Sequence, residues 1–207
     1  MATRPAWTVD ERNYVLRRDF EFKFNPGFAA SQKKKNVEAL HASIGKKALE
    51  ISSKSEEELG RKLSAFNLKL HHIPFECVFQ GSKKYNLGGP YTDLFHVSPK
   101  EAKRDERHHT SGTLIAFEYE GEEYPLKPLT FFYDYMYIQA VKESIPEEEL
   151  MGILAYEYFT DIEFNPNKSI NCQAKSVAIL KAMLQRFGRI PDMNREDFLF
   201  FYQEIKA

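Results

Sequence analysis

The chain has 207 residues, of which 43% are hydrophobic and 29% are charged, and its formal net charge is −1. These values fit one globular domain that is large enough to bury a sizeable core. They exclude a strong electrostatic binder of nucleic acid, which needs a basic excess. Any contact with DNA therefore has to be local.

The sequence favours a cytoplasmic protein with no membrane contact and no metal. Residues 1–18 are polar and charged, unlike a signal peptide, and no apolar run reaches transmembrane length. Cys77 and Cys172 are the two cysteines, and we expect both to be reduced thiols. His71-His72 and His108-His109 are adjacent pairs, whose side chains point apart on regular structure, so we expect no zinc site.

The N-terminal segment shows little pattern until its first aromatic residues. We expect residues 1–18 to be a loosely ordered terminus and residues 19–207 to form a single domain. Phe20, Phe22 and Phe24 alternate with charged residues, which predicts a half-buried strand. A turn at Asn25-Pro26-Gly27 ends it.

The next elements are predicted from spacing and capping signals. We expect a polar helix over 30–43 and a short strand over 48–52. Ser55-Glu56-Glu57-Glu58 matches a capping box. Leu59, Leu63 and Phe66 would form the buried stripe of the helix that follows it.

The segment at 75–83 carries the most chemical information. Phe75, Val78 and Phe79 fall on one side of a short helix. Glu76, Gln80 and Lys83 follow i, i+4, i+7 spacing, which places a carboxylate, an amide and an amine along the opposite side. Two interpretations stay open: an ordinary solvated helix surface, or a chemical face on a rigid support.

The remaining elements are mostly helical. Ser98-Pro99-Lys100-Glu101 is a second capping box, with proline at the first helical position, and predicts a helix over 99–108. Residues 114–120 alternate and predict a strand. Further helices are expected at 128–143, 146–157, 171–187 and 194–205, with a loop at 159–170. Helices around a few short strands indicate a predominantly helical α+β fold.

Common catalytic motifs are missing. No Gly-x-Gly-x-x-Gly, Walker loop or Gly-x-Ser-x-Gly occurs, so scattered polar residues must supply any chemistry. Lys103 and Arg107 lie one turn apart and form either a solvated helix face or a phosphate-binding patch. The helix start near Ser169 is either an ordinary cap or an anion site.

Aromatic residues beside polar ones have two interpretations as well. Phe66, near Ser64 and Asn67, and Phe164, beside Asn165, are core residues or stacking surfaces for a base. The aromatic run at 131–137 is core, or it is a surface for direct contact with a partner protein. Asp161 braces its own loop, or it is a second acidic group for glycosidic chemistry.

Four stretches together resemble the NADAR family, also called YbiA-like. Its patterns are Leu-Ser-Asn-Phe, Glu-x-x-(Phe/Tyr)-Gln-x-x-Lys, Ala-Lys-x-x-Gly-Arg and a late Asp-x-x-Trp-Gly with a following Asn. The corresponding segments are Leu63-Ser64-Ala65-Phe66-Asn67, Glu76 through Lys83, Ala102 through Arg107, and Asp161 through Asn165 with Asn171.

The departures indicate one branch of that family. Glu106 replaces the glycine, Phe164 the tryptophan and Asn165 the second glycine. These changes, with the stretches 89–94 and 159–174, are similar to the DarT-associated NADAR antitoxin branch. The likeness covers roughly residues 19–185.

The resemblance implies a YbiA-like single domain that hydrolyses the bond between ADP-ribose and guanine in DNA. Such an enzyme counteracts a DarT-type toxin, releases ADP-ribose and needs no metal or cofactor. Glu76 is then the acid/base, and Lys83 acts as an electrostatic partner or forms a Schiff base. Asp161 orients the ribose or assists Glu76.

Substrate contacts are expected from a larger set, in which cations bind pyrophosphate, aromatic rings stack on a base and amides supply neutral contacts. This set comprises Ser64, Phe66, Asn67, Gln80, Tyr91, Lys103, Arg107, Phe164, Asn165, Asn171 and Gln173. Two other functions stay open. One is an N-glycosidase for a free phosphorylated metabolite such as a riboflavin intermediate, and the other is a non-catalytic ADP-ribose or NAD-binding module.

Overall fold

The computed structural model describes residues 1–27 and 29–205, and the fold mixes α-helices with small β-sheets. The chain divides into two compact units. The first unit combines Met1–Ser64 with Ile145–Ala207, and the second unit is Ala65–Ser144. The α+β class is therefore confirmed.

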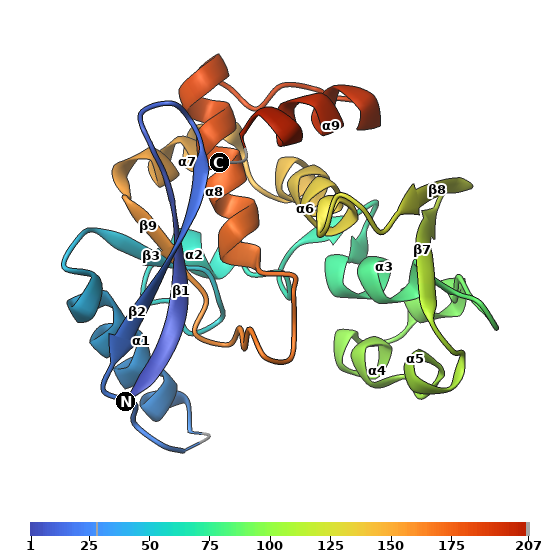
Figure 1. Ribbon diagram of the computed structural model, residues 1–207, viewed down its shortest axis with the longest axis horizontal. Coiled ribbons are helices and arrows are strands. Elements are labelled where there is room, and N and C mark those ends of the chain that lie inside the picture. Colours follow the sequence, from blue (N-terminus) through green and yellow to red (C-terminus); the bar gives the residue numbers. More distant parts are fainter. Residues whose placement is uncertain (28, 206–207) are drawn as a thin grey trace. The chain divides into compact units, whose positions relative to one another are not determined.

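The first unit is built on a four-stranded sheet with the order β2-β1-β9-β3. Its strands are β1 (Ala2–Val9), β2 (Val15–Phe22), β3 (Ala48–Glu50) and β9 (Tyr158–Thr160). β1 is antiparallel to both β2 and β9, whereas β3 runs parallel to β9. Figure 1 shows β1 and β2 as a long dark-blue hairpin.

This sheet differs from the loosely ordered terminus that we expected at residues 1–18. The strand β1 pairs along its whole length with β2, from Ala2 opposite Phe22 to Val9 opposite Val15. Ala6 is fully buried, because β9 covers its other edge. A partner about 150 residues away in sequence holds this segment, so local pattern alone did not reveal it. The domain span of 19–207 stays a prediction.

Helices complete the first unit. They are α1 (Ala30–Ile44), α2 (Glu58–Lys62), α7 (Glu147–Leu150), the 3-10 helix η2 (Met151–Ala155), α8 (Gln173–Phe187) and α9 (Arg195–Glu204). α8 packs against β1, with Val177, Leu180 and Leu184 among its buried side chains. The helices predicted at 30–43, 171–187 and 194–205 are confirmed within a few residues.

Two predictions for the first unit were wrong in detail. α2 starts at Glu58 without a side-chain cap, so the capping box at Ser55 does not form. Ser55 is buried against Gly60 instead, where an added Cβ would lie 2.3 Å from the serine hydroxyl. The predicted helix at 146–157 becomes 3-10 after Leu150.

The second unit surrounds a short central helix, α3 (Phe75–Gly81), with small sheets and helices. One sheet has the order β6-β7-β8 and the other pairs β4 with β5. The elements besides α3 are β4 (Lys69–Leu70), β5 (Ile73–Pro74), β6 (Lys83–Tyr85), η1 (Thr92–His96), α4 (Pro99–Arg104), α5 (Arg107–Thr110), β7 (Leu114–Tyr119), β8 (Glu122–Pro125) and α6 (Phe131–Ser144).

Aromatic rings form the core of the second unit. Phe117 stacks on Phe132 with ring centres 4.5 Å apart, and Phe79 meets Tyr133 edge-on at 5.0 Å. Phe131, Phe132, Tyr133 and Tyr137 are all buried. The aromatic run of α6 is therefore core, and the alternative of a partner-binding surface is not supported.

The helix predicted over 99–108 is two helices. The capping box at Ser98 is present, with Ser98 and Glu101 bonded to each other's backbone N–H. Asp105 then leaves the helical conformation, at φ −57° and ψ 128°, and α5 begins at Arg107. Lys103 and Arg107 therefore do not share one helix face.

Across residues 1–27 and 29–205, no helix combines the length and apolar character that crossing a membrane requires.

Candidate active site

Three polar side chains of the second unit form a linear chain of hydrogen bonds. The Gln80 amide Nε2 donates to Glu76 Oε1 at 2.9 Å, and Lys83 Nζ donates to Gln80 Oε1 at 2.5 Å. Glu76 and Gln80 are each only 6% exposed. The interpretation of this segment as a solvated helix surface was therefore wrong.

The chain reaches beyond the helix that was expected to carry it. α3 ends at Gly81, and Lys83 is the first residue of β6. Gly81 permits a close approach, because an added Cβ would lie 2.5 Å from the Phe95 ring and 2.9 Å from the Tyr91 carbonyl oxygen. The Tyr91 N–H also donates to the Gly81 carbonyl oxygen at 2.7 Å. This tight passage fixes the backbone just before Lys83.

Burial changes the chemistry of Lys83. Desolvation lowers the pKa of its amine to about 8, partly opposed by the nearby charge of Glu76 and helped by that of Lys103. At pH 7 roughly a tenth of such amines are neutral. The Nζ atom also lies 5.3 Å from the centre of the Phe79 ring. Lys83 is thus an amine that can act as a nucleophile near neutral pH.

Lys103 and Phe66 provide the exposed part of this group. Lys103 Nζ lies 3.9 Å from Glu76 Oε1 and 5.6 Å from the centre of the Phe66 ring. The Phe66 side chain is 49% exposed, contrary to the buried stripe that we expected it to join. An exposed ring beside a cation suits stacking of a planar base or sugar-phosphate.

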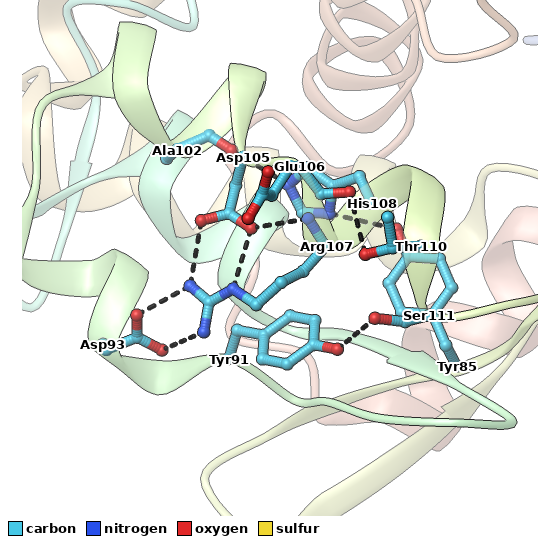
Figure 2. A network of polar contacts seen from close by, with 10 residues as sticks. All are labelled: Tyr85, Tyr91, Asp93, Ala102, Asp105, Glu106, Arg107, His108, Thr110 and Ser111. Carbon is cyan, nitrogen blue, oxygen red and sulfur yellow. Dashed lines mark hydrogen bonds and ion pairs between the residues drawn. The ribbon is translucent and has the colours of Figure 1, made fainter.

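Arg107 lies in a separate network, drawn in Figure 2. Its guanidinium bonds both carboxylate oxygens of Asp93, at 3.1 and 2.7 Å, and both of Asp105, at 2.8 and 2.9 Å. It also lies over the Tyr91 ring, 4.2 Å from the ring centre. The pKa of each carboxyl group is lowered, mainly by its hydrogen bonds from Arg107.

These contacts change the role expected for Arg107. Two carboxylates already occupy its N–H groups, so a phosphate would have to displace one of them. The Tyr91 hydroxyl is also engaged, in a hydrogen bond with the Ser111 hydroxyl. Arg107 and Tyr91 therefore brace the loop that precedes η1 as the structure stands.

His108 extends the same network toward β6. Its Nε2–H donates to the Ala102 carbonyl oxygen at 2.9 Å, so its Nδ1 accepts from the Tyr85 hydroxyl at 3.0 Å. Burial, followed by the charge of Lys83, lowers the pKa of His108. A neutral imidazole thus connects α4, α5 and β6 beside the candidate amine.

The first unit holds a second polar group around Glu50, the last residue of β3. Glu50 Oε1 accepts from the Ser52 hydroxyl at 2.7 Å and the Ile162 N–H at 2.8 Å, and its Oε2 accepts from the Thr160 hydroxyl at 2.6 Å. His41 Nε2 lies 2.8 Å from Thr160 Oγ1. Burial lowers the pKa of His41 to about 4.

Asp161 follows directly in the same unit. Its Oδ1 accepts from the N–H groups of Glu163 and Phe164, at 3.0 and 3.2 Å, so it does brace its own loop. Gln173 contributes a side-chain hydrogen bond. Burial, and then the charge of Glu50, raise the pKa of Asp161 to about 8.

With this geometry described, the comparison with known proteins can be read. The sequence matches the model of one protein family, DarT1-associated NADAR antitoxin, over residues 2–207. The chain belongs to this family. No curated protein matches it. The family name gives an antitoxin role and an association with a DarT1 toxin, so the resemblance inferred from the four motifs is confirmed.

In this NADAR-family chain the predicted site residues divide between the two units. The second unit carries Phe66, Asn67, Glu76, Gln80, Lys83, Tyr91, Lys103 and Arg107. The first unit carries Ser64, Asp161, Phe164, Asn165, Asn171 and Gln173. Within the second unit, contacts join Glu76, Gln80, Lys83, Lys103 and Phe66.

The predicted residues of the first unit have individual local roles. Ser64 is buried, and Phe164 is 8% exposed. Asn165 Oδ1 accepts from the Asn167 N–H at 3.0 Å, and the Asn171 carbonyl oxygen accepts from the Ser169 hydroxyl at 3.3 Å. Gln173 is the first residue of α8. The anion site considered near Ser169 therefore does not coincide with a helix start.

Sequence reasoning missed several residues that shape both groups. Asp93, Asp105 and His108 in the second unit, and Glu50 and Thr160 in the first, were not singled out. Asp105 offered one signal, since it is two residues before Arg107 within a charged run. Glu50 offered none, because its partners Thr160 and Ile162 lie 110 and 112 residues away.

Among residues 1–27 and 29–205, no group of three or more His, Cys, Asp or Glu side chains is arranged to hold a metal ion.

Proposed function

We propose that this chain is an N-glycosidase that removes ADP-ribose from guanine bases in DNA and thereby counteracts a DarT-type ADP-ribosyltransferase. This assignment refines the antitoxin role given by its family. We place the activity in the cytoplasm and expect a YbiA-like fold. The supporting observation is the buried chain of Glu76, Gln80 and Lys83 beside the exposed Lys103 and Phe66.

The reaction requires a group that adds to the anomeric carbon and a group that moves protons. The bond to be cleaved joins that carbon to the exocyclic nitrogen of guanine. After the ribose ring opens to an imine, the neutral Lys83 amine adds to the carbon and guanine leaves with a proton. Water then adds to the lysine imine, which releases ADP-ribose and regenerates the amine. Glu76 carries the protons in both steps.

Lys83 has a second role that the same contacts permit. As a cation it would tune Glu76 through Gln80 and form no bond to the sugar. Borohydride reduction during turnover separates the two roles. A reduced adduct at Lys83 supports the covalent route. Its absence at several pH values, with ADP-ribose still released, would leave the electrostatic role.

The exposed residues would bind the substrate. Phe66 would stack on adenine or guanine, and Lys103 would pair with the pyrophosphate. Arg107 would contribute to phosphate binding only after Asp93 releases it. The small net charge suits one modified nucleotide, flipped out or single-stranded, over a tightly held duplex.

We extend the proposal to the remaining family-pattern residues as substrate contacts. Asp161 would face the ribose. Neutral contacts and stacking would come from Ser64, Asn67, Tyr91, Phe164, Asn165, Asn171 and Gln173.

The deciding experiment uses an oligonucleotide that carries ADP-ribosyl-guanine, with products identified by mass spectrometry. Wild type should release ADP-ribose and unmodified DNA, and Glu76→Gln should lose at least a hundredfold in rate. Glu106→Gln makes the same change on an exposed residue of the same unit and should keep wild-type activity. Binding of ADP-ribose without any release would contradict the proposal and indicate a binding module.

A further inference from the structure

Glu50 is the most completely buried carboxyl group that the proposed chemistry does not use. It is 2% exposed at the end of β3, where it pairs in register with Thr160 of the parallel strand β9. Its three hydrogen-bond donors come from Ser52, Thr160 and Ile162. Two of them flank Asp161, so Glu50 holds the backbone on both sides of that residue.

The direction of these hydrogen bonds indicates the charge on Glu50. The Lys54 N–H donates to the Ser52 hydroxyl at 3.1 Å, which leaves the Ser52 proton for Glu50. The Ile162 N–H can only donate. A neutral His41 that donates from Nε2 leaves the Thr160 proton for Glu50 as well. Every chain of donors thus ends on Glu50, which favours its ionised form.

Asp161 has different surroundings. Two backbone N–H groups share its Oδ1, and Gln173 is its side-chain partner. A glutamine amide can turn to present either its NH2 group or its oxygen, so it can accept a proton from Asp161. Burial makes two adjacent carboxylate charges costly. Of the two groups, Asp161 is the one whose neighbours can accommodate a proton.

We propose that Glu50 and Asp161 form a carboxyl pair that holds one proton in neutral solution, with Glu50 ionised and the proton on Asp161. Glu50 is then a positioning residue that makes Asp161 a hydrogen-bond donor. An ionised Asp161 could only accept. The catalytic consequence rests on the proposed function: Asp161 would donate to an oxygen or nitrogen atom of the substrate.

The other charged groups nearby agree with this assignment. Glu163, two residues from Asp161, is paired with Lys33 at 2.8 Å on the exposed side of its loop. His41 stays neutral because burial lowers its pKa to about 4. Burial and Asp161 raise the pKa of the Cys172 thiol, so Cys172 is also neutral. Burial likewise raises the pKa of Glu50, against its three donors.

Carbon-13 NMR of the carboxyl carbons tests the pair directly in the whole protein. In wild type, the Asp161 signal, assigned through Asp161→Asn, should titrate near pH 8, and the Glu50 signal should titrate at a lower pH. In Glu50→Gln the Asp161 midpoint should fall by at least one pH unit, a tenfold loss of proton affinity. Glu163→Gln, which removes an exposed charge from the same loop, should shift it less.

Two results would overturn the pair. One is an Asp161 midpoint that Glu50→Gln leaves unchanged. The other, which needs only the wild type, is a Glu50 signal that titrates above that of Asp161. If Glu50→Gln fails to fold, this wild-type comparison still decides. Activity gives a separate readout: ADP-ribose release should decline above the Asp161 midpoint, and at a lower pH in Glu50→Gln. NMR shifts as expected without any release would refute the proposed function alone.

Discussion

At the scale of single residues, the amide of Gln80 is the feature that organises the candidate site. It separates a carboxylate from an amine and bonds both, through opposite ends of one rigid group. A neutral linker transmits position without placing a full charge against Lys83. We therefore assign Gln80 to the orientation of Glu76 and Lys83, in addition to the substrate contact that the sequence suggested.

Gln80→Glu tests this assignment with almost no change in shape. A carboxylate in contact with Lys83 Nζ stabilises the ammonium form, so the pKa of Lys83 should rise from about 8 by at least one unit. NMR of protein labelled at the lysine ε-carbon measures the titration. The exposed Gln203→Glu is the matched control. A Gln80 that only contacts substrate would leave the Lys83 titration of the free protein unchanged.

Arg107 is the second residue whose role the contacts define. Arg107→Lys keeps the positive charge but loses the planar fork that bonds Asp93 and Asp105 together. We expect a loss of about 1 kcal/mol in the free energy of unfolding, measured by urea denaturation. Arg104→Lys, on an exposed position of α4, should change it little. If Arg107 served only as a phosphate ligand, Arg107→Lys would leave stability unchanged and raise KM.

At the scale of elements, α3 owes its position to the aromatic core around it. Phe132 is 1% exposed and stacks on Phe117, which lies 5.5 Å from Phe79 of α3. Phe132→Ala should lower the free energy of unfolding by about 3–5 kcal/mol, because it removes a large buried ring. Phe200→Ala, at a ring that is 64% exposed, should stay within about 0.5 kcal/mol of wild type. Equal losses in chemical denaturation would contradict this view of the core.

Elements with local signals were the ones the sequence predicted well. The apolar spacing of Phe75, Val78 and Phe79 gave α3, and the Ser98 capping box gave the start of α4. β1 escaped prediction because Pro5 and alternating small residues form a weak pattern, and its stability comes from β2 and β9. The group around Glu50 escaped because strand register, which sequence does not display, brings Thr160 beside it.

At the scale of the whole molecule, buried titrating groups predict an unusual dependence of stability on pH. Asp161, with its pKa raised to about 8, binds a proton when folded that it releases when unfolded, so stability falls as pH rises toward 8. Lys83, with its pKa lowered to about 8, has the opposite effect between pH 8 and its ordinary value near 10.4. His41 adds a rise between about pH 4 and 6.5.

We therefore expect the free energy of unfolding to pass through a minimum near pH 8. Each slope approaches about 1.4 kcal/mol per pH unit for one proton. Urea denaturation across pH 6–10 measures it. Asp161→Asn should remove the fall below pH 8, and Lys83→Met should remove the rise above it. A curve that is flat across this range in wild type would show that neither group titrates as described.

The interleaved order of the two units has a consequence for synthesis on the ribosome. The second unit is continuous, so all of its residues are available once Ser144 has emerged. The sheet of the first unit has to wait, because β9 is made about 150 residues after the strand β1 that it borders. During that interval the β1–β2 hairpin presents an open edge that can recruit another strand. Nascent chains of this protein should therefore depend on chaperones most strongly between the completion of β2 and the arrival of Thr160.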